Sequence, residues 1–108
     1  MIDVDVVLPC YQPPNHWQKE LLELHHNLKN HYNLHFIIVL DGTPKLQIQN
    51  ALNELQTISI TCITLPKNFG KGYAIRQGVM HTKAALIIYT DIDLPFTVHS
   101  FKSLLQAL

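Results

Sequence analysis

Two aspartates separated by a single residue follow an apolar segment late in the sequence. Residues 86–95 read L-I-I-Y-T-D-I-D-L-P, so Asp91 and Asp93 come directly after a run that is typical of a buried strand. Alternate residues of a strand face the same way and lie ~6.6 Å apart, so a modest bend would bring both carboxylates toward one centre. Mg²⁺ and Mn²⁺ prefer oxygen ligands, and Mg²⁺ often combines one or two carboxylates with substrate phosphates. The pair is a candidate metal site; the alternative is that the aspartates cap the next helix or face solvent.

A second polar segment, K-N-F-G-K-G at residues 67–72, places two glycines and two lysines just before a predicted helix. Glycine lets a backbone turn tightly and approach a ligand closely, and the N-terminus of a helix favours an anion. Arg76 comes one helical turn after Gly72, so it can face the same edge. The spacing fits neither the Walker loop nor the dinucleotide-binding pattern. The segment is therefore either an anion-binding loop or an ordinary turn with solvated lysines.

The elements that must position these residues follow from the apolar pattern. Strands are predicted at residues 4–8, closed by Pro9, and at residues 35–40, 58–65 and 85–90. Helices are predicted from Asn15 or the next residue to about Tyr32, around residues 46–55, after Gly72 to about His81, and from about Thr97 onward. Strands and helices that alternate through short loops predict a doubly wound, mainly parallel α/β sheet in βαβαβαβα order. The first, second and fourth strands are nearly all apolar, which predicts burial on both faces.

The polar residues collect where these strands end. The first strand runs into Pro9 and Tyr11, the second into Asp41, the third into residues 67–72 and the fourth into Asp91. Ligands of doubly wound sheets bind outside the carboxyl ends of the strands, so one site at this edge is expected. Taken alone, Asp41 and the glycine after it could be only a turn.

Other residues capable of chemistry receive structural interpretations. Cys10 and Cys62 are too few and too far apart for a disulfide framework or a zinc site, so both are predicted to be reduced core residues, which points to the cytoplasm. A solvated surface is expected for the clustered histidines rather than a metal site, and a place in the core for the large aromatic residues. These are His25, His26, His31 and His35, and Trp17, Tyr32 and Phe36.

Composition narrows the class of protein. The 108 residues are 47% hydrophobic and 15% charged, which suits one folded domain or part of a larger one. The net charge of zero provides no global field for nucleic acid or an anionic membrane, so no nucleic-acid partner is expected. The start lacks the basic region of a signal peptide, and no apolar run approaches the ~20 residues of a membrane span. A soluble chain is expected.

Four stretches in order resemble the N-terminal half of family 2 glycosyltransferases with the GT-A fold. V-V-L-P-C-Y-Q resembles the opening strand with its V-P-x-Y-N ending, and F-I-I-V-L-D-G-T resembles the strand that usually ends V-D-D-G-S. P-K-N-F-G-K-G-Y-A-I-R-Q-G resembles N-x-G-K-G-x-A-x-R-x-G, and I-I-Y-T-D-I-D-L-P resembles the D-x-D segment, particularly in the polyprenyl- and dolichyl-phosphate sugar transferase branch. The sequence departs from the pattern at Leu40, where a second acidic residue is usual, and at Gln12, where Asn is usual.

The resemblance implies a role for each of these positions. Pro9, Tyr11 and Asp41 would line the pocket for the nucleotide base and ribose, and Arg76 and Lys71 would border it. Asp91 and Asp93 would form the D-x-D and hold Mg²⁺ or Mn²⁺ against the diphosphate of a nucleotide-diphosphate sugar. A cation there would stabilise the charge that develops on the diphosphate when the sugar leaves.

A complete domain of this family is considerably longer than 108 residues. We therefore expect residues 1–108 to form one donor-binding unit, with the acceptor half and the general base beyond Leu108 and no catalytic base in this chain. The resemblance implies a sugar transferase whose acceptor could be a polyprenyl phosphate at the cytoplasmic membrane face, although the chain alone is predicted to be inactive.

Two alternative functions stay open. The chain could be an inactive module that binds a nucleotide or a partner, or it could be a nucleotidyltransferase, which the lack of a Gly-rich loop after the first strand disfavours. A homodimer through a surface left open is also predicted.

Overall fold

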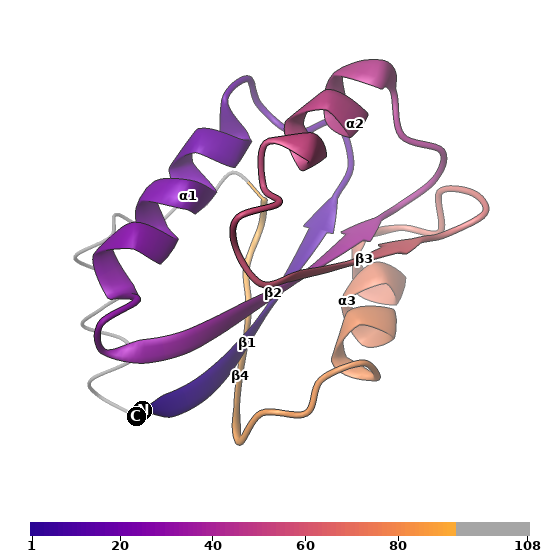
Figure 1. Cartoon of the computed structure of the whole chain (residues 1–108). Helices are drawn as coiled ribbons and strands as arrows, with labels where there is room; N and C mark the ends of the chain where they lie inside the picture. Colours follow the sequence, from indigo (N-terminus) through magenta and orange to yellow (C-terminus); the bar gives the residue numbers. More distant parts are fainter. Residues whose placement is uncertain (93–108) are drawn as a thin grey trace.

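The computed structural model describes residues 1–92, and strands alternate with helices throughout them (Figure 1). The predicted order of elements is confirmed over this range, whereas Asp93 and the helix predicted from about Thr97 lie outside the described residues. The elements are β1 (Ile2–Cys10), α1 (Trp17–Leu28), β2 (Tyr32–Leu40), α2 (Leu46–Asn53), β3 (Ile60–Thr64), α3 (Lys71–Val79) and β4 (Leu86–Tyr89).

The four described strands form one parallel sheet in the order β3-β2-β1-β4. β1 and β2 pair along their whole length, from Ile2 opposite Tyr32 to Cys10 opposite Leu40. Their carboxyl ends are therefore level, and the loops that follow them begin at the same edge of the sheet. β2 and β3 lie on one side of β1, whereas β4 lies on its other side, which confirms the predicted doubly wound α/β fold. Such sheets bind ligands at the carboxyl ends of the strands where the direction of winding changes.

Helices cover both faces of the sheet, with α1 and α2 on one side and α3 on the other (Figure 1). On the first face, the sheet residues Leu8 and Phe36 pack with the apolar stripe of α1, and Ala51 of α2 joins them. On the second face, Val7 packs against Ala74 of α3. The aromatic residues predicted to be in the core, Trp17, Tyr32 and Phe36, are all buried.

The first helix is shorter than its sequence predicts. Its buried residues Trp17, Leu21, Leu24 and Leu28 have the expected spacing, but the helix ends at Leu28 and Tyr32 already begins β2. Tyr32 continues the apolar periodicity of the helix, yet it pairs with Ile2 in the sheet. The prediction that the helix reaches Tyr32 was therefore wrong, because strand pairing overrode local periodicity.

Pro9 does not close the first strand, which continues to Cys10. The backbone N–H of Thr90 donates to the carbonyl of Val7 at 3.1 Å, so the polar groups of Val7 face β4. Pro9 is two residues further on and faces the same way, but β4 has ended at Tyr89, the partner of Val7. The missing N–H of proline thus falls just beyond the last paired residue of β4, so no hydrogen bond between the paired strands is lost.

Two burial predictions were wrong. β4 was predicted to be buried on both faces, but in residues 1–92 it pairs only with β1, and its Ile87 and Tyr89 side chains are 42% and 62% exposed. Cys10 is buried as predicted, whereas Cys62 is exposed because it lies on β3, at the opposite edge of the described sheet. An apolar run predicts that a segment is a strand, but it does not predict whether that strand lies at the centre or at the edge of the sheet.

Among the clustered histidines, His26 and His31 are exposed and two are partly buried. His35 lies on β2, and its ring nitrogens contact the hydroxyls of Ser59 at 2.5 Å and Thr61 at 2.8 Å. His25 lies on α1, and its buried Nδ1 has no hydrogen-bond partner among the described residues. His35 thus joins β2 to the edge strand β3.

Candidate functional site

The loops at the carboxyl ends of the strands enclose a cavity of about 390 Å³, which we call the rim cavity. Five of the predicted site residues line it, although they come from four separate segments of the chain. They are Pro9, Tyr11, Asp41, Lys71 and Asp91. The remaining lining residues are Gln12, Pro13, Pro14, Asn68, Gly70 and Ile92.

Asp41 is buried, with 6% of its surface exposed, and its carboxylate accepts hydrogen bonds from the protein backbone. Oδ1 accepts a hydrogen bond from the backbone N–H of Phe69 at 2.8 Å, and Oδ2 accepts one from that of Gly70 at 3.0 Å. The carboxylate at the end of β2 therefore holds the loop that leads into α3. Each oxygen keeps a further lone pair, so Asp41 can still contact a ligand in the rim cavity.

Gly70 permits this loop geometry. Its φ of 93° lies in the region that glycine enters freely and other residues rarely adopt. The turn directs the N–H of Gly70 toward Asp41 and also toward Oδ1 of Asn68, at 2.9 Å. The next residue, Lys71, then begins α3 at a fixed place beside the rim cavity.

The ammonium group of Lys71 forms an ion pair with Oδ1 of Asp91. Lys71 belongs to the first turn of α3, and Asp91 follows β4, so the contact joins two predicted motifs across the rim cavity. Both side chains remain largely accessible, with 59% and 45% of their surfaces exposed. The site therefore combines a cation, a carboxylate and the N-terminal end of a helix, which is suited to a ligand that carries both phosphate and a metal ion.

Two other predicted residues are not brought into this group by the described structure. Arg76 is exposed on α3 and is not among the residues that line the rim cavity. Asp93 lies outside the described residues, so its position relative to Asp91 stays a prediction.

The donor set is compatible with Mg²⁺ or Mn²⁺. In residues 1–92 no group of three or more His, Cys, Asp or Glu side chains is placed to hold a metal ion. Of the two described carboxylates at the rim cavity, Asp41 is held by backbone N–H groups, while Asp91 is half-buried and is bound through an ion pair with Lys71. Asp91 thus offers one oxygen ligand, and Mg²⁺ commonly takes its remaining ligands from phosphates and water.

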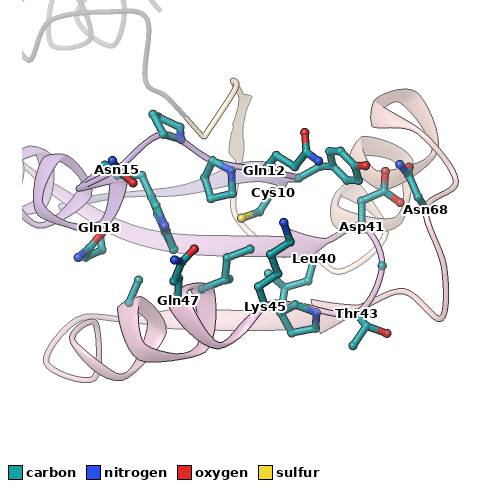
Figure 2. Close-up of a pocket in the computed structure, with 18 of the residues that line it drawn as sticks. Cys10, Gln12, Asn15, Gln18, Leu40, Asp41, Thr43, Lys45, Gln47 and Asn68 are labelled. Carbon is teal, nitrogen blue, oxygen red and sulfur yellow. The ribbon is translucent and has the colours of Figure 1, made fainter.

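A larger cavity of about 950 Å³ adjoins the rim cavity on the side of α2 (Figure 2). Asp41 and Asn68 lie at one end and Asn15, Gln18 and Gln47 at the other, with the Lys45 side chain between them (Figure 2). The sequence motifs include Asp41 and Asn68 but do not include Asn15, Gln18, Lys45 or Gln47, because no motif links these four residues. They meet because the loop after β1 and the start of α1 line the same cavity as the first turn of α2 (Figure 2).

The buried thiol of Cys10 also lines the larger cavity. Burial raises the pKa of Cys10 to about 12, with a smaller contribution from Cys62. Cys10 is therefore a neutral thiol at physiological pH and behaves as an apolar wall residue rather than a nucleophile.

A family model described as "Glycosyl transferase family 2" matches residues 5–108, nearly the whole chain. The chain belongs to glycosyltransferase family 2. The predicted resemblance is thereby confirmed, and the rim cavity of this family 2 chain contains residues from each of the four motifs that carried it.

Related proteins and structures agree with this family. A dolichyl-phosphate beta-glucosyltransferase, ALG5D of Trichomonas vaginalis (strain ATCC PRA-98 / G3), is 27% identical over 97 residues, which are 83% of this chain and 30% of the relative. The crystal structure of S. aureus TarS matches with a TM-score of 0.73 at 16% identity, over 97% of this chain and 32% of that one. The mannosyltransferase PcManGT from Pyrobaculum calidifontis, in complex with GDP-Man and Mn²⁺, matches with a TM-score of 0.64 at 16% identity, over 83% and 27%. The chain spans about a third of the length of the curated relatives that it matches.

Proposed function

We propose that the rim cavity binds the diphosphate of a nucleotide-diphosphate sugar and that this chain is the donor-binding part of a sugar transferase. The observation that carries the proposal is the meeting of Asp41, Lys71 and Asp91, from three separate segments of the chain, around one cavity. The related structure that contains GDP-Man and Mn²⁺ supports the ligand class.

We propose a role for each predicted residue that binds the nucleotide. Pro9, Tyr11 and Asp41 lie at the ends of β1 and β2 and would contact the base and ribose, with Arg76 bordering the nucleotide from α3. Lys71, at the start of α3, would contact the diphosphate, where the helix N-terminus also favours negative charge.

The proposed cofactor is Mg²⁺ or Mn²⁺, held by Asp91 and by Asp93 of the D-x-D segment. Such an ion supplies Lewis-acid stabilisation of the negative charge on the departing nucleotide diphosphate. Asp91 would orient the diphosphate through the ion, and Lys71 would donate hydrogen bonds to its oxygens.

For the acceptor of the transferred sugar, we propose a polyprenyl phosphate. The name of the dolichyl-phosphate relative supports this choice. We also propose that the general base and the acceptor site lie outside residues 1–108, that this chain alone does not catalyse transfer, and that the full enzyme works at the cytoplasmic face of a membrane. Within residues 1–92, no helix has the length and apolar character needed to cross a bilayer.

Calorimetric titration of UDP and GDP into the chain, with and without Mn²⁺, tests the donor-site proposal. Binding of either nucleotide should require Mn²⁺ and be lost in the Asp91→Asn, Asp93→Asn double variant. A Glu20→Gln, Glu23→Gln double variant, altered at exposed positions of α1, removes the same two negative charges and should bind like the wild type. A folded chain that binds neither nucleotide would contradict the proposal.

We also propose that two copies of the chain associate through a surface formed by β4 and the end of α3. Ile87, Tyr89 and Met80 form the apolar side chains of this surface, and Met80 is 75% exposed. Burying such side chains in a homodimer is favourable, and β4, which pairs only with β1 among residues 1–92, also offers backbone groups for pairing. Sedimentation equilibrium should show a dimer that Tyr89→Lys weakens; a monomer at high concentration would contradict this proposal.

A further inference from the structure

The ammonium group of Lys71 pairs with Oδ1 of Asp91, the carboxylate that is proposed above to hold a divalent cation. We propose that Lys71 is an exchangeable counter-ion: it neutralises Asp91 in the empty site and transfers to the donor diphosphate when a metal ion takes its place. This inference rests on the proposed donor site. It adds that Lys71 changes its partner from Asp91 to the diphosphate when the donor binds.

The backbone of Lys71 is fixed while its side chain is free to move. Asp41 binds the N–H groups of Phe69 and Gly70, directly before Lys71, and α3 follows it. The side chain itself is 59% exposed, and its ion pair with Asp91 is the only contact of its charged group among the described residues. Exposed ion pairs contribute little to stability, so the pair can open at small cost.

Charge gives the exchange its direction. A divalent cation bound to Asp91 would repel the ammonium group of Lys71, because both cations would contact the same carboxylate. A diphosphate bound at the rim cavity would attract Lys71 and would lie near the start of α3. Lys71 therefore opposes the binding of a metal ion alone and favours the binding of a metal ion together with a diphosphate.

Linkage turns this arrangement into cooperativity. If the diphosphate removes Lys71 from Asp91, it must raise the affinity for the metal ion, and the metal ion must raise the affinity for the diphosphate by the same factor. The chain would thereby bind little free metal ion and would assemble its metal site only with the nucleotide donor.

Manganese binding followed by electron paramagnetic resonance, with calorimetry of UDP and GDP, tests the inference without measuring activity. In Lys71→Met, Mn²⁺ alone should bind roughly two- to fivefold more tightly, because the competing ion pair is gone. The same variant should bind the nucleotide in the presence of Mn²⁺ roughly tenfold more weakly, because a charge-assisted contact is lost. A merely structural role for Lys71 would not move the two affinities in opposite directions.

Two control variants define the role of the charge. Lys71→Arg keeps the cation and should preserve the low affinity for Mn²⁺ alone. Lys67→Met removes a lysine of the same loop, whose ammonium lies 5.2 Å from the centre of the Phe69 ring, and should leave the affinity for Mn²⁺ alone unchanged.

The outcomes separate this inference from the proposed function. If the wild type binds a nucleotide with Mn²⁺ but Lys71→Met binds Mn²⁺ alone with equal or lower affinity, the exchange is wrong and the donor site stands. If the folded wild type binds no nucleotide with Mn²⁺, both are overturned. Opposite changes in the two affinities, absent in Lys67→Met, support the exchange.

Discussion

The carboxylate of Asp41 holds the backbone of Gly70 at 3.0 Å, although the two residues lie 29 positions apart in the sequence. The contact connects the end of β2 to the turn that starts α3. It gives Asp41 a structural use within the site, in addition to the nucleotide contact that its motif predicts. The loop that presents Lys71 is therefore held by the Asp41 carboxylate, in a turn that Gly70 permits.

Replacing Asp41 by Asn should loosen this loop. An amide group would place a donor against one of the two backbone N–H groups that now face carboxylate oxygens, so that N–H would lose its hydrogen bond to residue 41. We expect a loss of about 1–3 kcal/mol in the free energy of unfolding. Hydrogen exchange of the Phe69 and Gly70 amides should become faster, and nucleotide binding should weaken.

Asn68→Ala provides the matched control. The Asn68 side chain accepts from the same N–H of Gly70, at 2.9 Å, but its removal leaves both contacts of Asp41 in place. Its effect on the exchange of the Phe69 amide should be much smaller. Equal effects of the two variants would mean that Asp41 does not hold the loop.

The close packing of α3 on the sheet makes a second prediction. A Cβ at Gly78 would lie 2.4 Å from Cγ1 of Val7 and 3.0 Å from Cγ2 of Val39, so Gly78→Ala should reduce stability by about 1–3 kcal/mol. Gly72 lies in the same helix with open space around it, so Gly72→Ala should be neutral or slightly stabilising. Denaturant unfolding measures both, and equal stabilities would contradict the packing of α3 described above.

The two cysteines should differ in reactivity. Cys10 is buried, and burial raises its pKa to about 12, whereas Cys62 is exposed and has a pKa raised by partial burial. Iodoacetamide should therefore modify Cys62 slowly near neutral pH and faster as the pH rises, and should reach Cys10 only after unfolding. Mass spectrometry should find one label on the native chain and none on a native Cys62→Ser variant. Rapid labelling of both thiols in the folded chain would contradict the burial of Cys10.

His25 should make stability depend on pH. Burial lowers its pKa, with repulsion from Lys29 and His26 adding to the effect, so the folded chain binds fewer protons than the unfolded chain below pH 6.5. The contribution of neutral His25 is present in full above pH 6.5 and is lost as the pH falls from there through the lowered folded-state pKa. His25→Gln should therefore show a smaller drop in unfolding midpoint between pH 7 and 5, whereas His31→Gln, altered at an exposed position, should keep the wild-type slope. Parallel curves for His25→Gln and the wild type would rule out this role.

Local patterns in the sequence predict the elements of this fold but not their ends or their place in the sheet. The β-branched runs and the spacing of Trp17, Leu21, Leu24 and Leu28 identify strands and the first helix. The start of β2 at Tyr32 depends on its pairing with Ile2, a contact across 30 positions that no local period reveals. The exposure of Tyr89 likewise depends on the edge position of β4 in the described sheet.

For the candidate site, the sequence likewise predicts which residues come together but not how they contact one another. Parallel strands align their carboxyl ends, so the sequence could place Tyr11, Asp41, Lys71 and Asp91 at one edge. It could not predict that the carboxylate of Asp41 binds the N–H groups of the loop before Lys71, or that Lys71 pairs with Asp91. Those contacts depend on the φ of Gly70 and on side-chain positions that arise only in the folded chain.

The most direct measurement is a two-dimensional amide NMR titration of the chain with UDP or GDP in the presence of Mg²⁺. The account predicts that the amides of Tyr11, Gly70, Lys71 and Asp91, around the rim cavity, shift together and saturate with one affinity. The amides of Lys83 and Ala84, which bind Asp5 at the opposite end of the sheet, should not move. A folded chain whose rim-cavity amides stay unchanged at saturating nucleotide, or whose shifts centre on Asp5, would contradict the account.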